Sequence, residues 1–128
     1  METLNINGTA KTPTVRFSAQ DGMLEISGKS IPENSIEFYQ PLYDWLGNYS
    51  QQPNMTTSIK IQLEYFNTSS SKCLLDVFRK LEAIKKSGKS EVTVTWMYEE
   101  EDEDMMEAGE DYQTIVGIPF TMSKVVVE

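Results

Sequence analysis

Histidine is absent from the 128 residues of this chain. The absence removes the commonest general base, the commonest zinc ligand and the side chain that titrates near neutral pH. It also excludes phosphotransfer through a histidine. A serine or threonine nucleophile would lack its usual base, and no Gly-X-Ser-X-Gly turn is present to position one. We therefore expect a domain that does not act by catalysis.

Cysteine is nearly absent as well, because Cys73 stands alone and cannot form a disulfide within the chain. A lone thiol is typical of a reducing compartment. No apolar run approaches the roughly 20 residues of a membrane span, and the first residues lack the basic start and apolar core of a signal peptide. We expect a cytoplasmic protein that does not bind membranes.

Basic residues are scarce: 11 Lys and Arg face 20 Asp and Glu, for a formal net charge of -9. Such a surface repels the phosphates of nucleic acids and anionic lipids, so neither is an expected partner. Basic proteins remain open as partners. The length and the 39% hydrophobic content suit one globular domain spanning residues 1–128.

The spacing of apolar residues predicts eight elements in the order β-β-α-β-α-β-α-β. Strands are predicted at residues 14–18, 23–27, 58–66, 92–96 and 120–127, the first two joined as a hairpin by Asp21-Gly22. Helices are predicted from residue 31 to about 49, from about 72 to 86, and over 105–115. Pro41 should kink the first helix or restart it. The order indicates an α/β fold: a single domain with a mixed sheet covered by about three helices.

Alternation around Ile59, Ile61, Leu63 and Tyr65 marks residues 58–66 as the central strand. A polar break, residues 67–71, follows it and contains four hydroxyls in a row before Lys72. One hydroxyl suffices to cap a helix, and the pattern alone favours capping. Four hydroxyls at a helix N-terminus also fit a phosphate site, because the helix dipole and a nearby lysine tolerate the added charge. Burying that charge in a partner interface would weaken binding, so a phosphate here would switch affinity.

An acidic run, residues 99–104, precedes the third predicted helix. The run lacks the calcium-loop spacing, because the first glycine, Gly109, comes too late. We interpret it as a solvated loop that enters a helix, and a basic partner protein remains an alternative. No metal site is predicted.

Two tyrosines of the first predicted helix, Tyr39 and Tyr43, lie off its main apolar face. We expect them to be partly exposed, as interface tyrosines often are, although ordinary packing also explains them. Tyr65 and Phe66, directly before the hydroxyl segment, are further candidate partner contacts.

Three stretches, residues 24–42, 63–72 (Leu-Glu-Tyr-Phe-Asn-Thr-Ser-Ser-Ser-Lys) and 96–111, together resemble the SiaC family of bacterial regulatory phosphoproteins. The resemblance extends from about Thr12 to Phe120. It implies a fold like that of anti-sigma-factor antagonists (the STAS fold), with a switch hydroxyl in a strand-to-helix loop.

The resemblance also implies a partner-switching cycle without a cofactor. A serine/threonine kinase would phosphorylate Thr68, and a PP2C-type phosphatase would remove the phosphate. The unphosphorylated form would bind and activate a diguanylate cyclase, so cyclic di-GMP output would follow the phosphorylation state. The switch loop would comprise Asn67, Ser69, Ser70, Ser71 and Lys72. The alternative function is a constitutive scaffold that binds partners through its acidic face without a phospho-switch.

Overall fold

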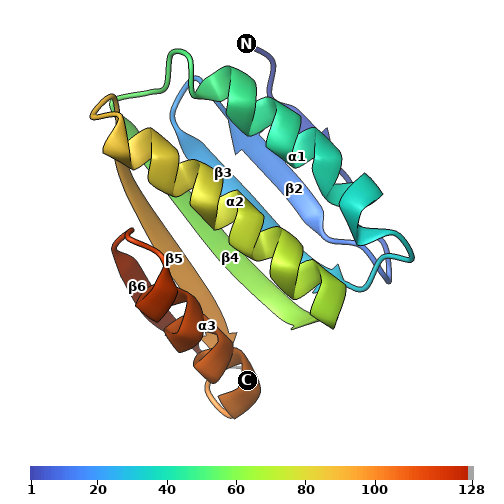
Figure 1. Ribbon diagram of the computed structural model, residues 1–128. Helices are drawn as coiled ribbons and strands as arrows, with labels where there is room; N and C mark the ends of the chain where they lie inside the picture. Colours follow the sequence, from blue (N-terminus) through green and yellow to red (C-terminus); the bar gives the residue numbers. More distant parts are fainter. Residues whose placement is uncertain (127–128) are drawn as a thin grey trace.

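The computed structural model describes residues 1–126, which form one six-stranded sheet and three helices (Figure 1). The strands are β1 (Leu4–Ile6), β2 (Thr14–Ser18), β3 (Met23–Ser30), β4 (Thr56–Phe66), β5 (Glu91–Glu99) and β6 (Phe120–Val125). The helices are α1 (Ser35–Tyr49), α2 (Thr68–Lys86) and α3 (Glu103–Ile115). The predicted α/β domain, a mixed sheet with three helices, is confirmed.

The strands lie in the sheet in the order in which they follow one another along the chain. β1, β2 and β3 pair antiparallel, whereas β3, β4, β5 and β6 are parallel neighbours. Each parallel connection passes through one helix and advances by one strand, so the three helices lie on the same face of the sheet (Figure 1). The carboxyl ends of the parallel strands lie at the same end of the sheet, and α1, α2 and α3 all begin at that end.

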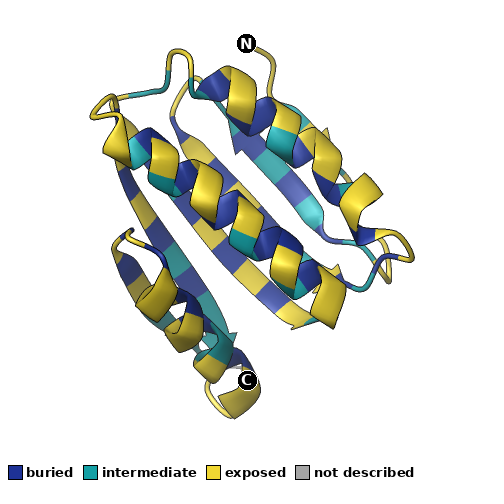
Figure 2. Ribbon diagram, in the orientation of Figure 1, coloured by how far each residue is buried: buried dark blue, intermediate teal, exposed yellow. Residues whose placement is uncertain are grey.

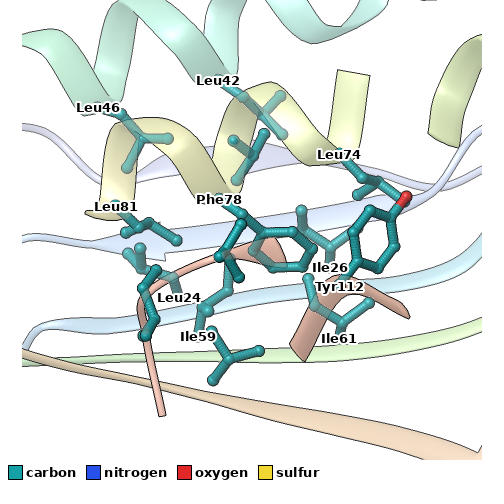
Figure 3. Packing of buried hydrophobic residues seen from close by; sticks show 14 of the residues in the cluster. Leu24, Ile26, Leu42, Leu46, Ile59, Ile61, Leu74, Phe78, Leu81 and Tyr112 are labelled. Atoms are coloured by element: carbon teal, nitrogen blue, oxygen red, sulfur yellow. The ribbon is translucent and has the colours of Figure 1, made fainter. Parts of the chain in front are cut away.

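The core lies between the helices and the face of the sheet that they cover (Figures 2 and 3). Ile26, Ile59 and Val94 point into it and are fully buried. Lys60 and Thr93, which alternate with them along the strands, are exposed on the other face. Within residues 1–126 no helix covers that face, so the domain has two layers.

Pro41 does not interrupt α1, contrary to the prediction of a kink or restart at this residue. Its ring lies on the exposed side of the helix, where water can bind the carbonyl that the proline leaves without a donor. The helix also begins later than predicted. The side chain of Asn34 caps it by accepting a hydrogen bond from the Glu37 N–H at 3.1 Å.

A bulge in the pairing of β3 and β4 changes which side chains face the helices. Leu63 pairs with Gly28, but the next pair joins Tyr65 to Lys29, so Glu64 is an extra residue on β4. Gly28 has a φ of +106°, a backbone angle that residues with a Cβ rarely adopt. The bulge reverses the alternation, and Tyr65, which the pattern placed with the core residues, is 57% exposed.

The two ends of the chain also differ from the prediction. The short strand β1 was not predicted; it adds to the sheet edge by pairing with β2. β6 ends at Val125, and the last residue of the predicted strand, Val127, lies outside the described residues.

Candidate functional site

The hydroxyl segment begins α2 instead of forming a loop ahead of it. Asn67 is the N-cap: its Oδ1 accepts from the Ser70 N–H at 2.9 Å, and its carbonyl accepts from the Ser71 N–H at 3.0 Å. The side-chain bond satisfies a donor that a helix end otherwise leaves free, and the carbonyl bond is the first regular bond of the helix. The predicted switch loop is therefore wrong as a loop, because Thr68 through Lys72 already belong to the helix.

Three of the four hydroxyls are engaged in hydrogen bonds. Ser70 is 0% exposed and donates to the carbonyl oxygen of Ser30 at 3.0 Å, while the Ser30 hydroxyl donates to Ser70 Oγ at 2.8 Å. Ser69 Oγ lies 2.6 Å from Ser35 Oγ, which ties the start of α2 to the start of α1. The Ser71 hydroxyl accepts from the Tyr112 hydroxyl at 3.3 Å, beside a shorter bond of 2.7 Å from the same hydroxyl to the Ser71 carbonyl oxygen.

Thr68 is the exception among the four. Its side chain is exposed, and among residues 1–126 its hydroxyl has no hydrogen-bond partner. The first turn of α2 contains no acidic residue, whereas α1 has Glu37 and α3 has two carboxylates there. Lys72 lies one turn further along and is exposed, on the same side of the helix as Thr68. This helix end is therefore accessible and electrostatically suited to an anion.

Tyr39 is buried, and the expectation of partial exposure is wrong for this residue. Its hydroxyl lies 2.8 Å from Ser30 Oγ, and this hydrogen bond lets the polar tip enter the core. Burial raises the pKa of the Tyr39 phenol well above its ordinary value. Tyr39 therefore offers a partner no surface. It links α1 through Ser30 to Ser70 instead.

Tyr43 is half-buried, in line with the expectation of partial exposure. Its hydroxyl donates to the Cys73 carbonyl at 3.2 Å, and Lys80 Nζ lies 5.5 Å from the centre of its ring. Burial raises the pKa of the Tyr43 hydroxyl. Both contacts hold the ring against α2.

Beyond the bulge, Phe66 and Tyr65 have different surroundings. The Phe66 ring is half-buried and meets Trp96 edge-on, with ring centres 6.2 Å apart. Tyr65 is exposed near the start of α2. Both aromatic side chains thus lie at the carboxyl end of β4, directly before Thr68 at the start of α2.

A groove of about 410 Å³ separates α2 from α3. It is mostly apolar, and its lining residues are Phe66, Thr68, Ser71, Lys72, Leu75, Ala108, Asp111, Tyr112 and Ile115. Tyr112 lies beside Phe78, with ring centres 5.0 Å apart (Figure 3), and its hydroxyl bonds Ser71 across the groove. Burial raises the pKa of this hydroxyl. At the far end, Arg79 of α2 donates to the Ile115 carbonyl at 3.1 Å.

The sequence did not predict this groove, because predicting it requires knowing that α3 lies next to α2. A signal was nevertheless present. The lining residues on each helix are spaced i, i+3, i+4 and i+7, from residue 68 to 75 on α2 and from 108 to 115 on α3. Each set forms a stripe along its helix that another element could cover.

The acidic run surrounds the start of α3. Asp102 caps this helix by accepting from the Met105 N–H at 3.0 Å, and Glu103 and Asp104 occupy the first turn. The interpretation as an acidic loop entering a helix is confirmed. Across residues 1–126, no group of three or more histidine, cysteine or acidic side chains is arranged to hold a metal ion.

A second depression, of about 590 Å³, lies on the uncovered face of the sheet near the carboxyl ends of β3, β4 and β5. Its lining is mostly polar and includes Ser27, Gln62 and Glu99. None of the hydroxyls at the start of α2 contributes to it. We therefore place the candidate site at the start of α2 and the adjoining groove.

Comparison with known proteins matches this chain to a family of regulatory proteins. The family model described as SiaC family regulatory phosphoprotein matches residues 6–125, nearly the whole chain. The class is therefore that of regulatory phosphoproteins, which control other proteins. The chain belongs to the SiaC family. No helix within residues 1–126 has the length and apolar character needed to span a membrane.

Relatives from Pseudomonas aeruginosa cover almost the same length. An uncharacterised protein of strain UCBPP-PA14 is 31% identical over 122 residues, which is 95% of this chain and 96% of that protein. The crystal structure of apo-SiaC is 30% identical and superposes with a TM-score of 0.87, covering 96% of this chain and 99% of SiaC. SiaC in complex with the diguanylate cyclase SiaD, which it activates, gives a TM-score of 0.88 over 95% of this chain and 99% of SiaC.

Proposed function

We propose that this chain is a cytoplasmic, phosphorylation-switched activator of a diguanylate cyclase. The unphosphorylated form binds and activates the cyclase. A serine/threonine kinase releases it by phosphorylating Thr68, and a PP2C-type phosphatase resets it. Support comes from the 30% identical SiaC of Pseudomonas aeruginosa, which is the activator of the cyclase SiaD.

The observation that carries the assignment to Thr68 is the contrast among the four hydroxyls. Ser70 is buried, and Ser69 and Ser71 are hydrogen-bonded to α1 and to α3. A phosphoryl group on any of these would displace a contact that joins elements of the fold. At Thr68 it would displace water alone, so the folded protein is already a substrate at this position.

Electrostatics predict how a phosphate on Thr68 would act. It adds about -1.5 to -2 charges at pH 7. The α2 dipole and Lys72, one turn away, each favour it by about 0.3–1 kcal/mol at an exposed site. The fold therefore tolerates the modification. A partner that covers Thr68 must desolvate the new charge, which costs several kcal/mol and exceeds the local gain. Phosphorylation thus weakens binding without unfolding the protein.

A reconstituted assay tests the cycle. The purified chain is added to the diguanylate cyclase of its host, before and after kinase treatment, with the modified residue identified by peptide mass mapping. The unphosphorylated chain should increase cyclic di-GMP synthesis, and the chain phosphorylated at Thr68 should lose both binding and activation. Thr68→Ala should be insensitive to the kinase, whereas the control Ser69→Ala should switch like the original chain. Equal binding by phosphorylated and unphosphorylated chains would contradict the proposal.

One observation favours a second candidate function, a constitutive acidic scaffold. Both ion pairs found within residues 1–126 involve Glu82, so none of the carboxylates of residues 99–104 forms an ion pair there. A scaffold predicts that reversing the charge of this run abolishes partner binding while phosphorylation changes nothing. The same assay, with the charge-reversed variant added, separates the two functions.

A further inference from the structure

We propose that Asn7 is a site of spontaneous deamidation, at which the chain acquires a carboxylate as it ages. The modification is distinct from phosphorylation of Thr68 and does not depend on the proposed function. Asn7 is followed by Gly8, and the pair lies just after β1, which ends at Ile6. Arg16 of β2 donates a hydrogen bond to the Asn7 amide and directs the reaction to aspartate.

The reaction needs no reactant other than water. The backbone nitrogen of Gly8 attacks Cγ of Asn7, and the bond between Cγ and Nδ2 breaks. Nδ2 leaves as ammonia, taking up the hydrogen that the Gly8 nitrogen gives up, and a succinimide ring is formed. Water then opens the ring at either of its carbonyl carbons. Attack at Cγ gives aspartate, whereas attack at the backbone carbonyl carbon of Asn7 gives isoaspartate.

The attacking nitrogen of Gly8 is accessible. Asn7 and Gly8 are both exposed, and Gly8 has no side chain to hinder the approach of its nitrogen to Cγ. Its N–H donates to the Thr14 hydroxyl at 3.1 Å, which is a side-chain bond and not a bond of the strand ladder. Breaking it leaves the pairing of Ile6 with Val15 in place. The nitrogen can therefore turn towards Cγ while β1 stays in the sheet.

The fold also retains glycine at this position. A Cβ on residue 8 would lie 2.5 Å from Thr14 Oγ1 and 3.0 Å from the Thr14 nitrogen, so a larger residue would push β2 or the loop aside. The least hindered partner for an asparagine is thus fixed next to Asn7 by packing.

The other asparagines are less reactive, because none precedes a glycine and each is restrained by the fold. Asn34 and Asn67 cap α1 and α2, and their Oδ1 atoms accept backbone N–H groups of those helices. Asn54 accepts from a backbone N–H through Oδ1 and donates to a backbone carbonyl through Nδ2. Asn5 lies within β1 and Asn48 within α1. Asn7 should therefore react first.

Arg16 selects the product. Its Nη2 donates to Asn7 Oδ1 at 2.9 Å, and its Nη1 donates to the carbonyls of Ile6 and Val15 at 2.9 Å each, so the guanidinium is held beside the amide. Oδ1 becomes the ring oxygen on Cγ. A cation hydrogen-bonded to that oxygen stabilises the negative charge that develops on it when water attacks Cγ. Ring opening at Cγ is therefore favoured, and aspartate exceeds isoaspartate.

The choice of product matters for the edge of the sheet. Aspartate keeps the length of the backbone, and its carboxylate gives Arg16 a charged acceptor in place of a neutral one, which strengthens the hydrogen bond between β1 and β2. Isoaspartate adds a methylene group to the backbone and would move Gly8 away from Thr14. Arg16 thus preserves the pairing of β1 while the chain ages.

Ageing of the purified full chain in mildly alkaline buffer tests the site. Isoelectric focusing follows the appearance of a more acidic species, and peptide mass mapping locates the change. We expect the acidic species to carry the modification at Asn7. Asn7→Ser should abolish it, whereas Asn48→Ser, the matched control at an exposed asparagine of α1, should leave it unchanged. Thermal unfolding verifies that both variants fold.

The urea-unfolded chain provides the reference for this experiment. If Asn7 is intact in the folded chain after a time in which the unfolded chain has converted it, the proposal is wrong. Earlier deamidation at any other asparagine of the folded chain would also overturn it.

The ratio of the two products tests the role of Arg16 independently of the overall rate. Peptide mapping separates aspartate from isoaspartate, and a protein-isoaspartate methyltransferase labels the latter alone. The ratio of aspartate to isoaspartate should be higher in the folded chain than in the urea-unfolded chain by about twofold or more. Arg16→Gln should bring the folded chain close to the unfolded ratio. Equal ratios in the folded and unfolded chains would refute product selection by Arg16, whether or not Arg16→Gln folds.

Discussion

The buried hydroxyl of Ser70 and the exposed hydroxyl of Thr68 should differ sharply in their contribution to stability. Ser70→Ala removes two hydrogen bonds, one to the Ser30 carbonyl and one from the Ser30 hydroxyl. Neither Ser30 atom is orphaned, because its carbonyl still accepts from the Asn67 N–H and its hydroxyl still meets Tyr39. The expected loss is therefore about 1 kcal/mol for each bond.

The substitution Thr68→Ala provides the matched reference. Alanine improves helix propensity by a few tenths of a kcal/mol at either position, so the gain largely cancels between the two variants. Thr68→Ala removes no hydrogen bond found in the structure and should stay within about 0.5 kcal/mol of the original chain. The difference between Ser70→Ala and Thr68→Ala should then be about 1–2 kcal/mol.

Urea and thermal unfolding measure this difference. For 128 residues, 1 kcal/mol corresponds to a change in Tm of about 4 °C, so Ser70→Ala should melt roughly 4–8 °C below Thr68→Ala. The urea m-values should be equal, since the exposed surface hardly changes. Equal stability of the two variants would refute the argument that only Thr68 is free of a structural role. The assignment of the switch residue would then lose its main support.

Two further predictions concern the core. Burial raises the pKa of Tyr39 and Tyr112 above the ordinary 10.0, so the stability that their neutral phenols contribute is complete below pH 10 and is lost as pH rises beyond it. Tyr39→Phe should reduce this loss, measured as urea midpoints between about pH 9 and 11. Gly109→Ala would force a methyl group against the indole of Trp96 and cost about 1–3 kcal/mol, whereas Gly47→Ala, with open space around it, should be neutral or stabilising in thermal unfolding.

The sequence pattern predicted the elements that have long amphipathic repeats. The helix through Leu74, Phe78 and Leu81 and the strand through Ile59 and Ile61 both appear where the apolar spacing placed them. In each, the spacing of buried residues is a direct consequence of which side faces the core. The order of elements and the mixed sheet followed from these segments.

Features that depend on distant pairing were missed. β1 has three residues and exists because Leu4 to Ile6 pair with β2, a contact that leaves no periodic signal. The bulge at Glu64 depends on how β4 aligns with Gly28, so alternation alone put Tyr65 inside. The hydroxyl of Tyr39 can be buried because it is hydrogen-bonded to Ser30, which is in turn hydrogen-bonded to Ser70, and these two serines come from two other elements.

The candidate site was predicted in part. The hydroxyl segment was located from composition, but its helical start was not, because the Asn67 cap extends α2 to Thr68. The pattern could not rank the four hydroxyls. Their ranking depends on partners in α1, β3 and α3: Ser35, Ser30 and Tyr112.

The uncovered face of the sheet makes the protein convenient for site-specific labelling. Cys73 is buried, so a maleimide dye would react slowly with the native chain. A cysteine introduced at Thr93 would be exposed on the side of the sheet away from α1, α2 and α3. A fluorophore attached there would leave Thr68 and the groove unobstructed, so fluorescence anisotropy could follow the docking of a partner and its release while the kinase acts.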